Sequence, residues 1–269
     1  MPDLNAILDL YREPLFWQFP VASSLLSVAA FLLFALPLTW IAWRDPVWAR
    51  KYRIQPRRMD VPRWFWPSLG RLLVNSGVTF LLILPLWPLL RLSNVHAGPL
   101  PPWWEVAWQL LFFVYLDDFL FYWMHRALHT PKLFRHVHAV HHRVRTPCAV
   151  AGVYFHWMEY AAISSLVLVG PLLVGAHVVT LYIWVVLRQL EAASGHCGYD
   201  WPFEPLRLLP LYDGNGYHDY HHGSFKGNYA GAVGWLDRVF GTSSAGYAEY
   251  EQRRRQGMFP ADAGRADAV

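Results

Sequence analysis

Eight of the 13 histidines in this chain fall into three short clusters. The first has the spacing HxxxH and the other two have the spacing HxxHH; in order, their members are His125 and His129, then His138, His141 and His142, then His218, His221 and His222. Residues three or four apart share one face of a helix. Each cluster can therefore direct two or three imidazoles towards a single point.

Imidazoles gathered in this way are typical of a metal site. Iron, zinc, copper and nickel all bind imidazole nitrogen well. A structural zinc ion takes four ligands and an octahedral ion takes six, so eight histidines exceed what one ion can use. One cluster alone could arise by chance, but three in one chain predict a centre with two metal ions.

The remaining histidines are of two kinds. His156 and His196 flank a long apolar stretch, and either could supply an extra metal ligand. His196 is the better candidate, whereas His156 could equally be an outer-sphere or interface imidazole. The other three, His96, His136 and His177, are predicted to be bystanders. We expect no catalytic side chain beyond the metal ligands.

Carboxylates are expected beside the metal-bound imidazoles, because such rings usually donate their second N–H to a carboxylate or a carbonyl. Asp118 precedes His125 by seven residues, which is two helical turns on the same face. Asp219 lies inside the third cluster and is the second candidate. Further candidates are Asp117, Glu191 and Asp237.

The elements that must position these residues are apolar. The hydrophobic fraction is 55%, and only 16% of residues are charged, against about 25% in soluble proteins. Four apolar stretches cover residues 14–43, 72–90, 106–124 and 160–187. Since a spanning helix needs about 20 apolar residues, the chain is predicted to be an integral membrane protein. Asp117 and Asp118 interrupt the third stretch and should face protein or water.

The basic residues predict the orientation. The net charge of +4 could indicate a nucleic-acid partner, but we expect none, because residues 44–63, between the first two stretches, hold seven arginines and lysines and only two aspartates. The positive-inside rule makes this loop cytoplasmic. The third stretch then returns the chain to the cytoplasm near His125, and the basic segment 126–145 agrees with that placement.

The fourth stretch is predicted to form a hairpin. All three clusters must reach one site, so residues 160–187 have to cross the membrane an even number of times or dip in and return. Gly170-Pro171 and Gly175 offer places for the break. The two cysteines, Cys148 and Cys197, form no CxxC pair and are expected to be small buried residues.

The predicted fold is an all-α integral-membrane helical bundle with a cytoplasmic, histidine-rich helical cap that holds two metals. Residues 1–104 would form the membrane anchor, 105–247 the catalytic domain and 248–269 a cytoplasmic tail. No basic region precedes the first apolar stretch, so we expect that stretch to remain as an anchor rather than act as a cleaved signal.

The clusters and their flanking residues resemble those of the membrane fatty acid hydroxylase/sterol desaturase superfamily. The resemblance covers roughly residues 105–245 and rests on DDFLFYWMHRALHT, HVHAVHH, LRQLEAASGHCGYD, LLPLYDGNGYHDYHH and GNYAGAVGWLDRVFGT. Within the superfamily, the stretches HRALHT, HDYHH, GNY and DRVFGT are most similar to the carbon-4 methylsterol oxidases, and sterol 25-hydroxylases are close.

The resemblance implies an O2-dependent, non-haem di-iron monooxygenase that attacks a C–H bond of a lipid, with a sterol as the first choice. Its cofactors would be two iron ions and O2, with electrons from NAD(P)H delivered by a reductase and a small cytochrome or ferredoxin. It would lie in the endoplasmic reticulum of a eukaryote or the inner membrane of a bacterium, with its active site on the cytoplasmic side.

Two alternatives remain open from the residues alone. The same iron pair could act as a desaturase or as a hydroxylase of another position on a sterol or fatty acyl chain. A metal transporter would also carry membrane histidines. The chain departs from the methylsterol-oxidase pattern at Cys148-Ala149, where Phe-Gly is usual, and at 153–157, which reads Val-Tyr-Phe-His-Trp for Glu-Tyr-Ala-His-Pro. Both departures leave the histidine clusters whole and bear on the substrate.

Overall fold

The computed structural model describes residues 4–255, and within that range every regular element is a helix. Four helical segments are long and apolar enough to span a membrane: Pro14–Arg44, Val61–Leu90, Trp103–Leu128 and Trp157–Val174. The predicted all-α membrane bundle is therefore confirmed. Most of the predicted tail, residues 256–269, lies outside the described residues, and helix α13 (Ala245–Arg255) runs through the predicted boundary at 247/248. The division into domains stays a prediction.

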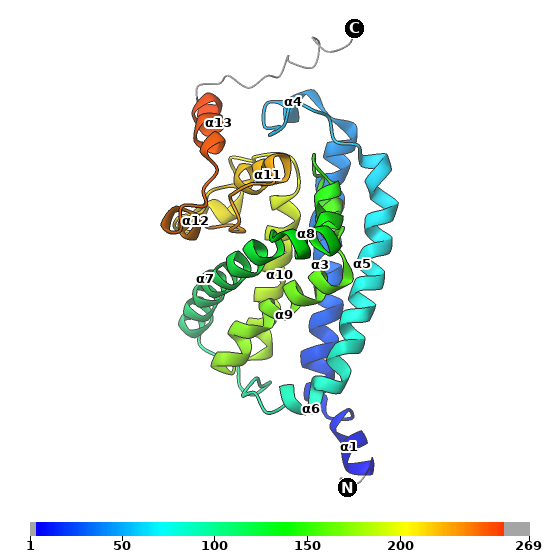
Figure 1. Ribbon diagram of the computed structural model, residues 1–269. Helices are drawn as coiled ribbons and strands as arrows, with labels where there is room; N and C mark the ends of the chain where they lie inside the picture. Colours follow the sequence, from blue (N-terminus) through cyan, green and yellow to red (C-terminus); the bar gives the residue numbers. More distant parts are fainter. Residues whose placement is uncertain (1–3, 256–269) are drawn as a thin grey trace.

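Two long helices run side by side along the length of the molecule (Figure 1): α3 (Ala22–Arg44) and α5 (Val61–Ile83). They are preceded and linked by α1 (Leu4–Leu10), α2 (Pro14–Phe16), the π-helical turn η1 (Trp17–Val21) and α4 (Val47–Arg50). Asp60 caps the start of α5, where its carboxylate accepts a hydrogen bond from the backbone N–H of Arg63. Pro62 in the first turn suits that position, because its missing N–H has no helical partner there.

The packing of α3 is that of a membrane helix. Its buried positions are mostly small, as at Ala30, Ala35 and Ala42, whereas Leu33 and Trp40 point outwards and are exposed. Small residues allow close approach between helices when lipid, not water, covers the outer face. The apolar outer face therefore indicates a lipid-facing surface.

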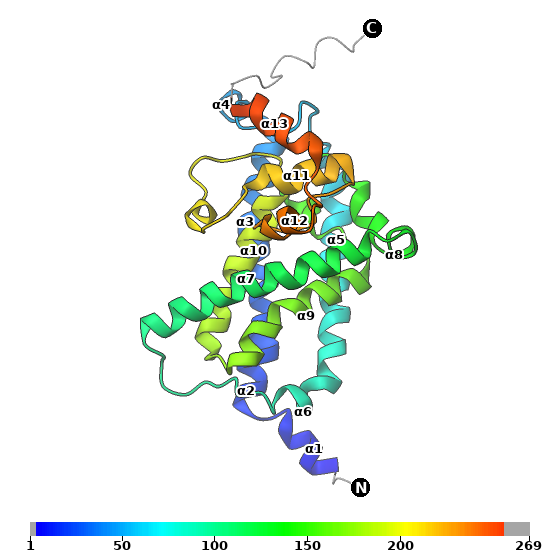
Figure 2. The ribbon, with the colours of Figure 1, turned by 60° about the vertical axis from the view of Figure 1, so that its left-hand side comes forward.

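Helix α7 (Trp103–Leu128) crosses this upright pair at a steep angle and carries the first histidine cluster towards the middle of the molecule (Figure 2). The chain reaches it through η2 (Leu84–Leu86), α6 (Trp87–Leu90) and an irregular loop. His125 lies in the last turn of α7, and His129 is its C-cap residue.

The fourth apolar stretch forms the predicted helical hairpin. Its arms are α9 (Trp157–Val174) and α10 (Val178–Gly195). The turn lies at Gly175, whose φ of 62° suits glycine, while Gly170 and Pro171 stay inside α9. The tip next to Gly175 pairs His177 with His96 at the α6 end of the molecule. The hairpin returns the chain to the histidine end, as the convergence of the clusters requires.

A cap of short helices covers the other end (Figures 1 and 2). It contains α8 (Pro131–His136), η3 (His138–Arg143), η4 (Ala149–Val153), η5 (Pro205–Leu208), α11 (Asn215–Ser224), α12 (Trp235–Val239) and α13. The second cluster lies on the 3-10 helix η3, not on an α-helix, and the third lies on α11. Both cysteines are buried and free, as predicted.

Candidate metal centre

Nine histidines form two groups in the interior of the cap. The first group is His125, His129, His138, His142 and His221, and the second is His141, His196, His218 and His222. Within each group, one ring nitrogen from every residue lies within 4.8 Å of all the others. The structure brings together all nine predicted ligands and divides them five to four; that they bind metal stays a proposal.

The ring nitrogens that meet are the Nε2 atoms. In the group of five, Nε2 of His138 lies 2.9 Å from that of His142 and 3.1 Å from that of His125. In the group of four, Nε2 of His196 lies 3.1 Å from that of His218 and 3.4 Å from that of His141. Each HxxHH cluster contributes to both groups, so the two groups are built as one unit.

The Nδ1 atoms of four rings fix the tautomer. Nδ1 of His125 lies 2.6 Å from the carbonyl oxygen of Tyr229. Nδ1 of His221 lies 2.7 Å from the carbonyl oxygen of Gly227. His196 and His222 make the same kind of contact, to the carbonyls of Ala192 and Val144. A neutral imidazole has a single N–H. With that proton on Nδ1, each Nε2 presents a lone pair to its group.

Lone pairs that converge at about 3 Å repel one another unless a cation lies between them. Every group has enough neutral nitrogens for one ion, and both cysteines lie outside the two groups. The donor set is therefore purely imidazole and fits two metal ions.

Burial keeps the grouped imidazoles neutral, because surroundings without water disfavour the charged ring. Burial lowers the pKa of His129 to about 3, and the neighbouring His221 adds to the effect. The pKa values of His196 and His221 each fall to about 4, mainly for the same reason. These rings are therefore neutral at pH 7, and in His196 and His221 the Nδ1 contacts to carbonyls leave Nε2 without a proton, as metal binding requires.

The acid that holds a grouped imidazole is Glu159, which the sequence analysis missed. Its Oε1 lies 2.6 Å from Nδ1 of His138, and both side chains are 1% exposed. A carboxylate in this position orients the ring and makes Nε2 a stronger ligand. The signal was present in the sequence, because Glu159 is the only carboxylate between residues 157 and 187.

We expect Glu159→Gln to lower metal affinity and turnover by about 10–100-fold, since loss of such a partner has that effect on other metal sites. The amide keeps the size of the side chain but removes the charge that polarises His138. Metal content after dialysis against a weak chelator measures the change. Glu105→Gln, at the start of α7, is the matched control and should leave metal content unchanged; equal loss in both variants would count against a specific role for Glu159.

The two predicted outer-sphere aspartates bond to backbone and amide groups rather than to imidazole. Asp118 accepts hydrogen bonds from the N–H groups of Ala232 and Val233, at 2.9 and 3.1 Å. Asp219 accepts one from the side chain of Gln55 at 2.8 Å. Among the described residues neither bonds to a grouped histidine, so each supports a loop of the cap.

The predicted bystanders lie away from the two groups. His136 is exposed and contacts Arg135, while His96 and His177 meet at the opposite end of the molecule. His156 also lies outside the groups: it caps α9, where its Nδ1 accepts a hydrogen bond from the N–H of Met158. A role for His156 next to the metals stays a prediction.

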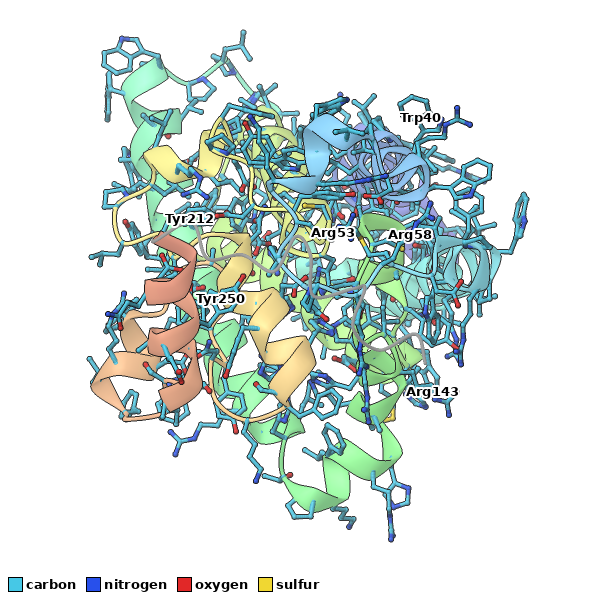
Figure 3. All side chains as sticks on the ribbon, turned by 90° about the horizontal axis from the view of Figure 1, so that it is seen from above. Trp40, Arg53, Arg58, Arg143, Tyr212 and Tyr250 are labelled. Carbon is cyan, nitrogen blue, oxygen red and sulfur yellow. The ribbon has the colours of Figure 1, made fainter. Side chains whose placement is uncertain are left out.

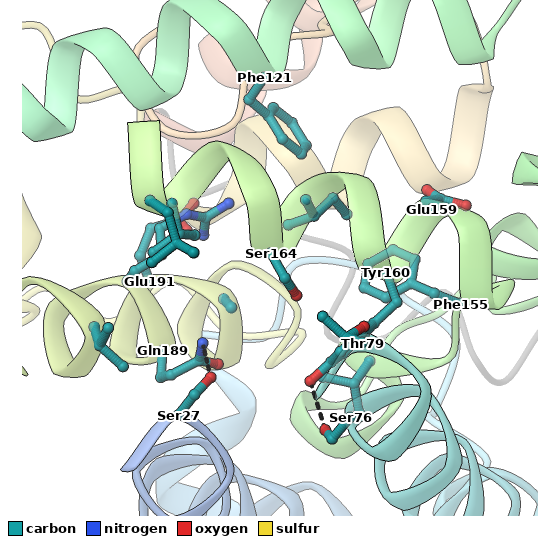
Figure 4. Close-up of a pocket in the computed structure, with 18 of the residues that line it drawn as sticks. Ser27, Ser76, Thr79, Phe121, Phe155, Glu159, Tyr160, Ser164, Gln189 and Glu191 are labelled. Carbon is teal, nitrogen blue, oxygen red and sulfur yellow. Dashed lines mark hydrogen bonds and ion pairs between the residues drawn. The ribbon is translucent and has the colours of Figure 1, made fainter. Parts of the chain in front are cut away.

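An apolar cavity adjoins the histidines in the middle of the bundle (Figure 4). Its walls come from α3, α5, α7, α9 and α10, and the rings of His125, His138 and His141 form part of its lining. Phe155 also lines the cavity and stacks on His141, with ring centroids 4.2 Å apart. A long apolar molecule from the membrane could thus reach the two histidine groups.

Comparison with known proteins agrees with this site. The family model described as fatty acid hydroxylase matches residues 110–242. A methylsterol monooxygenase of Arabidopsis thaliana is 36% identical over 242 residues, which cover 88% of this chain and 90% of the relative. The chain belongs to the fatty acid hydroxylase family. The segment that matches the family model contains all nine grouped histidines, so the resemblance seen in the sequence is confirmed.

Two further relatives in the family carry different names. A very-long-chain aldehyde decarbonylase of Oryza sativa subsp. indica is 38% identical, with 82% of this chain and 84% of the relative covered. A C-4 methylsterol oxidase of Schizosaccharomyces pombe is 29% identical, with 98% of this chain and 92% of the relative covered. No solved structure matches the chain.

Proposed function

We propose that this protein is a membrane-bound di-iron monooxygenase that oxidises a C–H bond of a sterol, with a methyl group on ring carbon 4 as the target. The observation that carries the proposal is the pair of imidazole groups at one end of an apolar cavity inside a membrane bundle. The near full-length similarity to a methylsterol monooxygenase and a C-4 methylsterol oxidase supports the choice of substrate.

Iron is the metal we propose for both groups. Imidazole suits iron, zinc, copper and nickel alike, but zinc has no redox chemistry. A pair of iron ions held by the nine histidines would supply the activation of O2 that a monooxygenase needs. The histidines set the separation of the ions, and Glu159 retains the Nδ1 proton of His138 so that Nε2 stays a ligand.

The chain's own contribution is to position the lipid and to exclude water. The cavity brings the substrate from the bundle interior to His138 and His141, and the stacked ring of Phe155 closes one side of that position. A dry, shaped site restricts oxidation to the carbon that faces the histidines and protects the oxidant from side reactions.

Electrons are proposed to come from NAD(P)H through a reductase and a small cytochrome or ferredoxin. The histidine end of the molecule is seen in Figure 3, where Arg58 and Arg143 lie on the surface. Arg57 and Arg145 on loops and Lys132 on α8 are also exposed at this end. Such a basic surface attracts an acidic carrier. By the positive-inside rule, this surface also supports a cytoplasmic orientation of the active site. In a eukaryotic host, the proposed location is the membrane of the endoplasmic reticulum.

The test is lipid analysis in a host that lacks its own C-4 methylsterol oxidase. Expression of the protein should deplete 4-methylsterols and yield 4-hydroxymethyl or 4-carboxyl sterols, detected by mass spectrometry. His221→Ala should yield none, and His136→Ala, which changes an exposed histidine outside both groups, should match the unaltered protein.

The rice relative makes aldehyde decarbonylation the second candidate. In that case the same cells would accumulate a hydrocarbon one carbon shorter than an added fatty aldehyde, with sterols unchanged. A new double bond without added oxygen would indicate a desaturase. Metal uptake into vesicles without any lipid product would indicate a transporter. Each of these results would overturn the proposed function.

A further inference from the structure

Six hydroxyl- or amide-bearing side chains from four helices are labelled in Figure 4 among the residues that line the cavity. They are Ser27 on α3, Ser76 and Thr79 on α5, Tyr160 and Ser164 on α9, and Gln189 on α10. All but Gln189 lie within segments able to span a membrane. Polar groups at such depth are unfavourable without partners and generally serve a function.

Part of this set is already paired across the cavity. The hydroxyl oxygens of Ser76 and Tyr160 lie 2.8 Å apart, and Nε2 of Gln189 donates to the hydroxyl oxygen of Ser27 at 3.0 Å. A bonded pair of hydroxyls still has one O–H and several lone pairs to offer. The Ser76–Tyr160 pair can therefore both donate to and accept from a ligand.

Thr79 is the unsatisfied member. It is 9% exposed, and its Oγ1 is buried without a hydrogen-bond partner among the described residues. A helical threonine or serine can bond to a carbonyl one turn back, as Ser23 does to Phe19 in the same cavity. Thr79 makes no such bond, so its hydroxyl remains available to an occupant of the cavity.

Thr79 and the Ser76–Tyr160 pair lie at the same part of the cavity wall. Ser76 and Thr79 are three residues apart and share a face of α5, and Figure 4 shows Thr79 beside the pair. Tyr160 directly follows Glu159, the residue that holds His138. The ring of Tyr160 also lies 6.5 Å from that of Phe155, which stacks on His141, so one aromatic ring separates this part of the cavity wall from the histidines.

We propose that Ser76, Thr79 and Tyr160 form a subsite for the ring hydroxyl of a polycyclic lipid, and that this subsite determines substrate choice. The proposal rests on the proposed function and refines it. A hydroxyl both donates and accepts, which matches what the three side chains offer. A hydrocarbon chain in the same place would leave Thr79 unsatisfied. The subsite therefore favours a hydroxylated sterol over an unsubstituted acyl chain.

The test compares binding of a 4-methylsterol with that of its 3-deoxy analogue to the purified, metal-loaded protein in nanodiscs, by displacement of the tritiated sterol. The unaltered protein should prefer the hydroxylated sterol by at least about tenfold, because a site built to bond a hydroxyl rejects the analogue that lacks it. Thr79→Val and Tyr160→Phe remove only hydroxyls and should reduce the preference to about twofold or less. KM for the hydroxylated sterol should rise while kcat stays within about twofold.

Ser23→Ala is the matched control, because its hydroxyl is bound to its own helix, and it should retain the full preference. Metal content of each variant verifies folding, and Ser76→Ala provides a further variant if one fails to fold. Variants that oxidise sterol and keep the full preference would overturn the subsite alone. An unaltered protein that binds neither sterol and converts another lipid would overturn the proposed function, and the subsite with it.

Discussion

Replacement of His218 by alanine is expected to remove one of two bound metal ions and to abolish lipid oxidation. His218 belongs to the group of four, so the variant leaves three imidazoles for that ion. Loss of an outer partner of a metal ligand already lowers affinity or activity by about 10–100-fold, and loss of a direct ligand should exceed that. Elemental analysis of the purified protein should give one ion per chain in place of two, and product formation should fall below detection.

The group of five provides a contrast. His129 is the least buried of its members, and its loss leaves four imidazoles, enough for one ion. His129→Ala should therefore retain two ions, one of them with lower affinity, while His136→Ala should be indistinguishable from the unaltered protein. If His218→Ala keeps two tightly bound ions, the two groups are not separate sites.

Removal of both metal ions is expected to lower the melting temperature of the protein by about 10–20 °C. Ligand binding stabilises a fold by about 2.7 kcal/mol per site at 100 times the dissociation constant, and in chains of this size each kcal/mol is worth about 2–4 °C. Without the ions, the converging Nε2 atoms of the nine rings repel one another. Tryptophan fluorescence during heating, in detergent and with or without a strong chelator, measures the shift.

His218→Ala offers an internal standard for this measurement. It should lose about half of the stabilisation that metal provides, and chelator should remove only the remaining half. An unaltered protein that melts at the same temperature with and without chelator would mean that packing alone holds the nine rings together.

The convergence of the clustered histidines could be predicted because their signal is local. Spacing of three and four residues places His125 and His129, or His218 and His222, on one helical face wherever the helix lies. The hairpin also followed from the sequence, since the clusters could meet only if the chain returned to them. The first inference needs only a pattern within a few residues, and the second needs only one constraint on the topology of the chain.

The division of the ligands between two groups could not be predicted in the same way. His138 and His142 point to the group of five, while His141, between them, points to the group of four. That split depends on how η3 and α11 face each other across the cap and on where α10 places His196. Neither is visible in the spacing HxxHH.

Glu159 was missed for a related reason. Candidate acids were sought near the clusters in sequence, yet Glu159 lies 21 residues after His138. It contacts His138 only because the first turn of α9 lies next to η3 in the fold. Asp118 has the predicted position on α7, but its carboxylate is taken up by the backbone of Ala232 and Val233. Sequence distance is a poor guide to outer-sphere contacts where helices cross.

At its open end, the α9–α10 hairpin contacts both histidine groups. The first turn of α9 holds His138 of the group of five through Glu159, and His196 of the group of four follows the end of α10. The arms join at Gly175, and the tip is fixed to the opposite end of the molecule by the contact between His177 and His96. The separation of the two proposed metal ions would therefore be linked to the opening angle of a single hairpin. That angle is set at the opposite end of the molecule, where a bound lipid or a mutation could alter the chemistry without approaching the histidines.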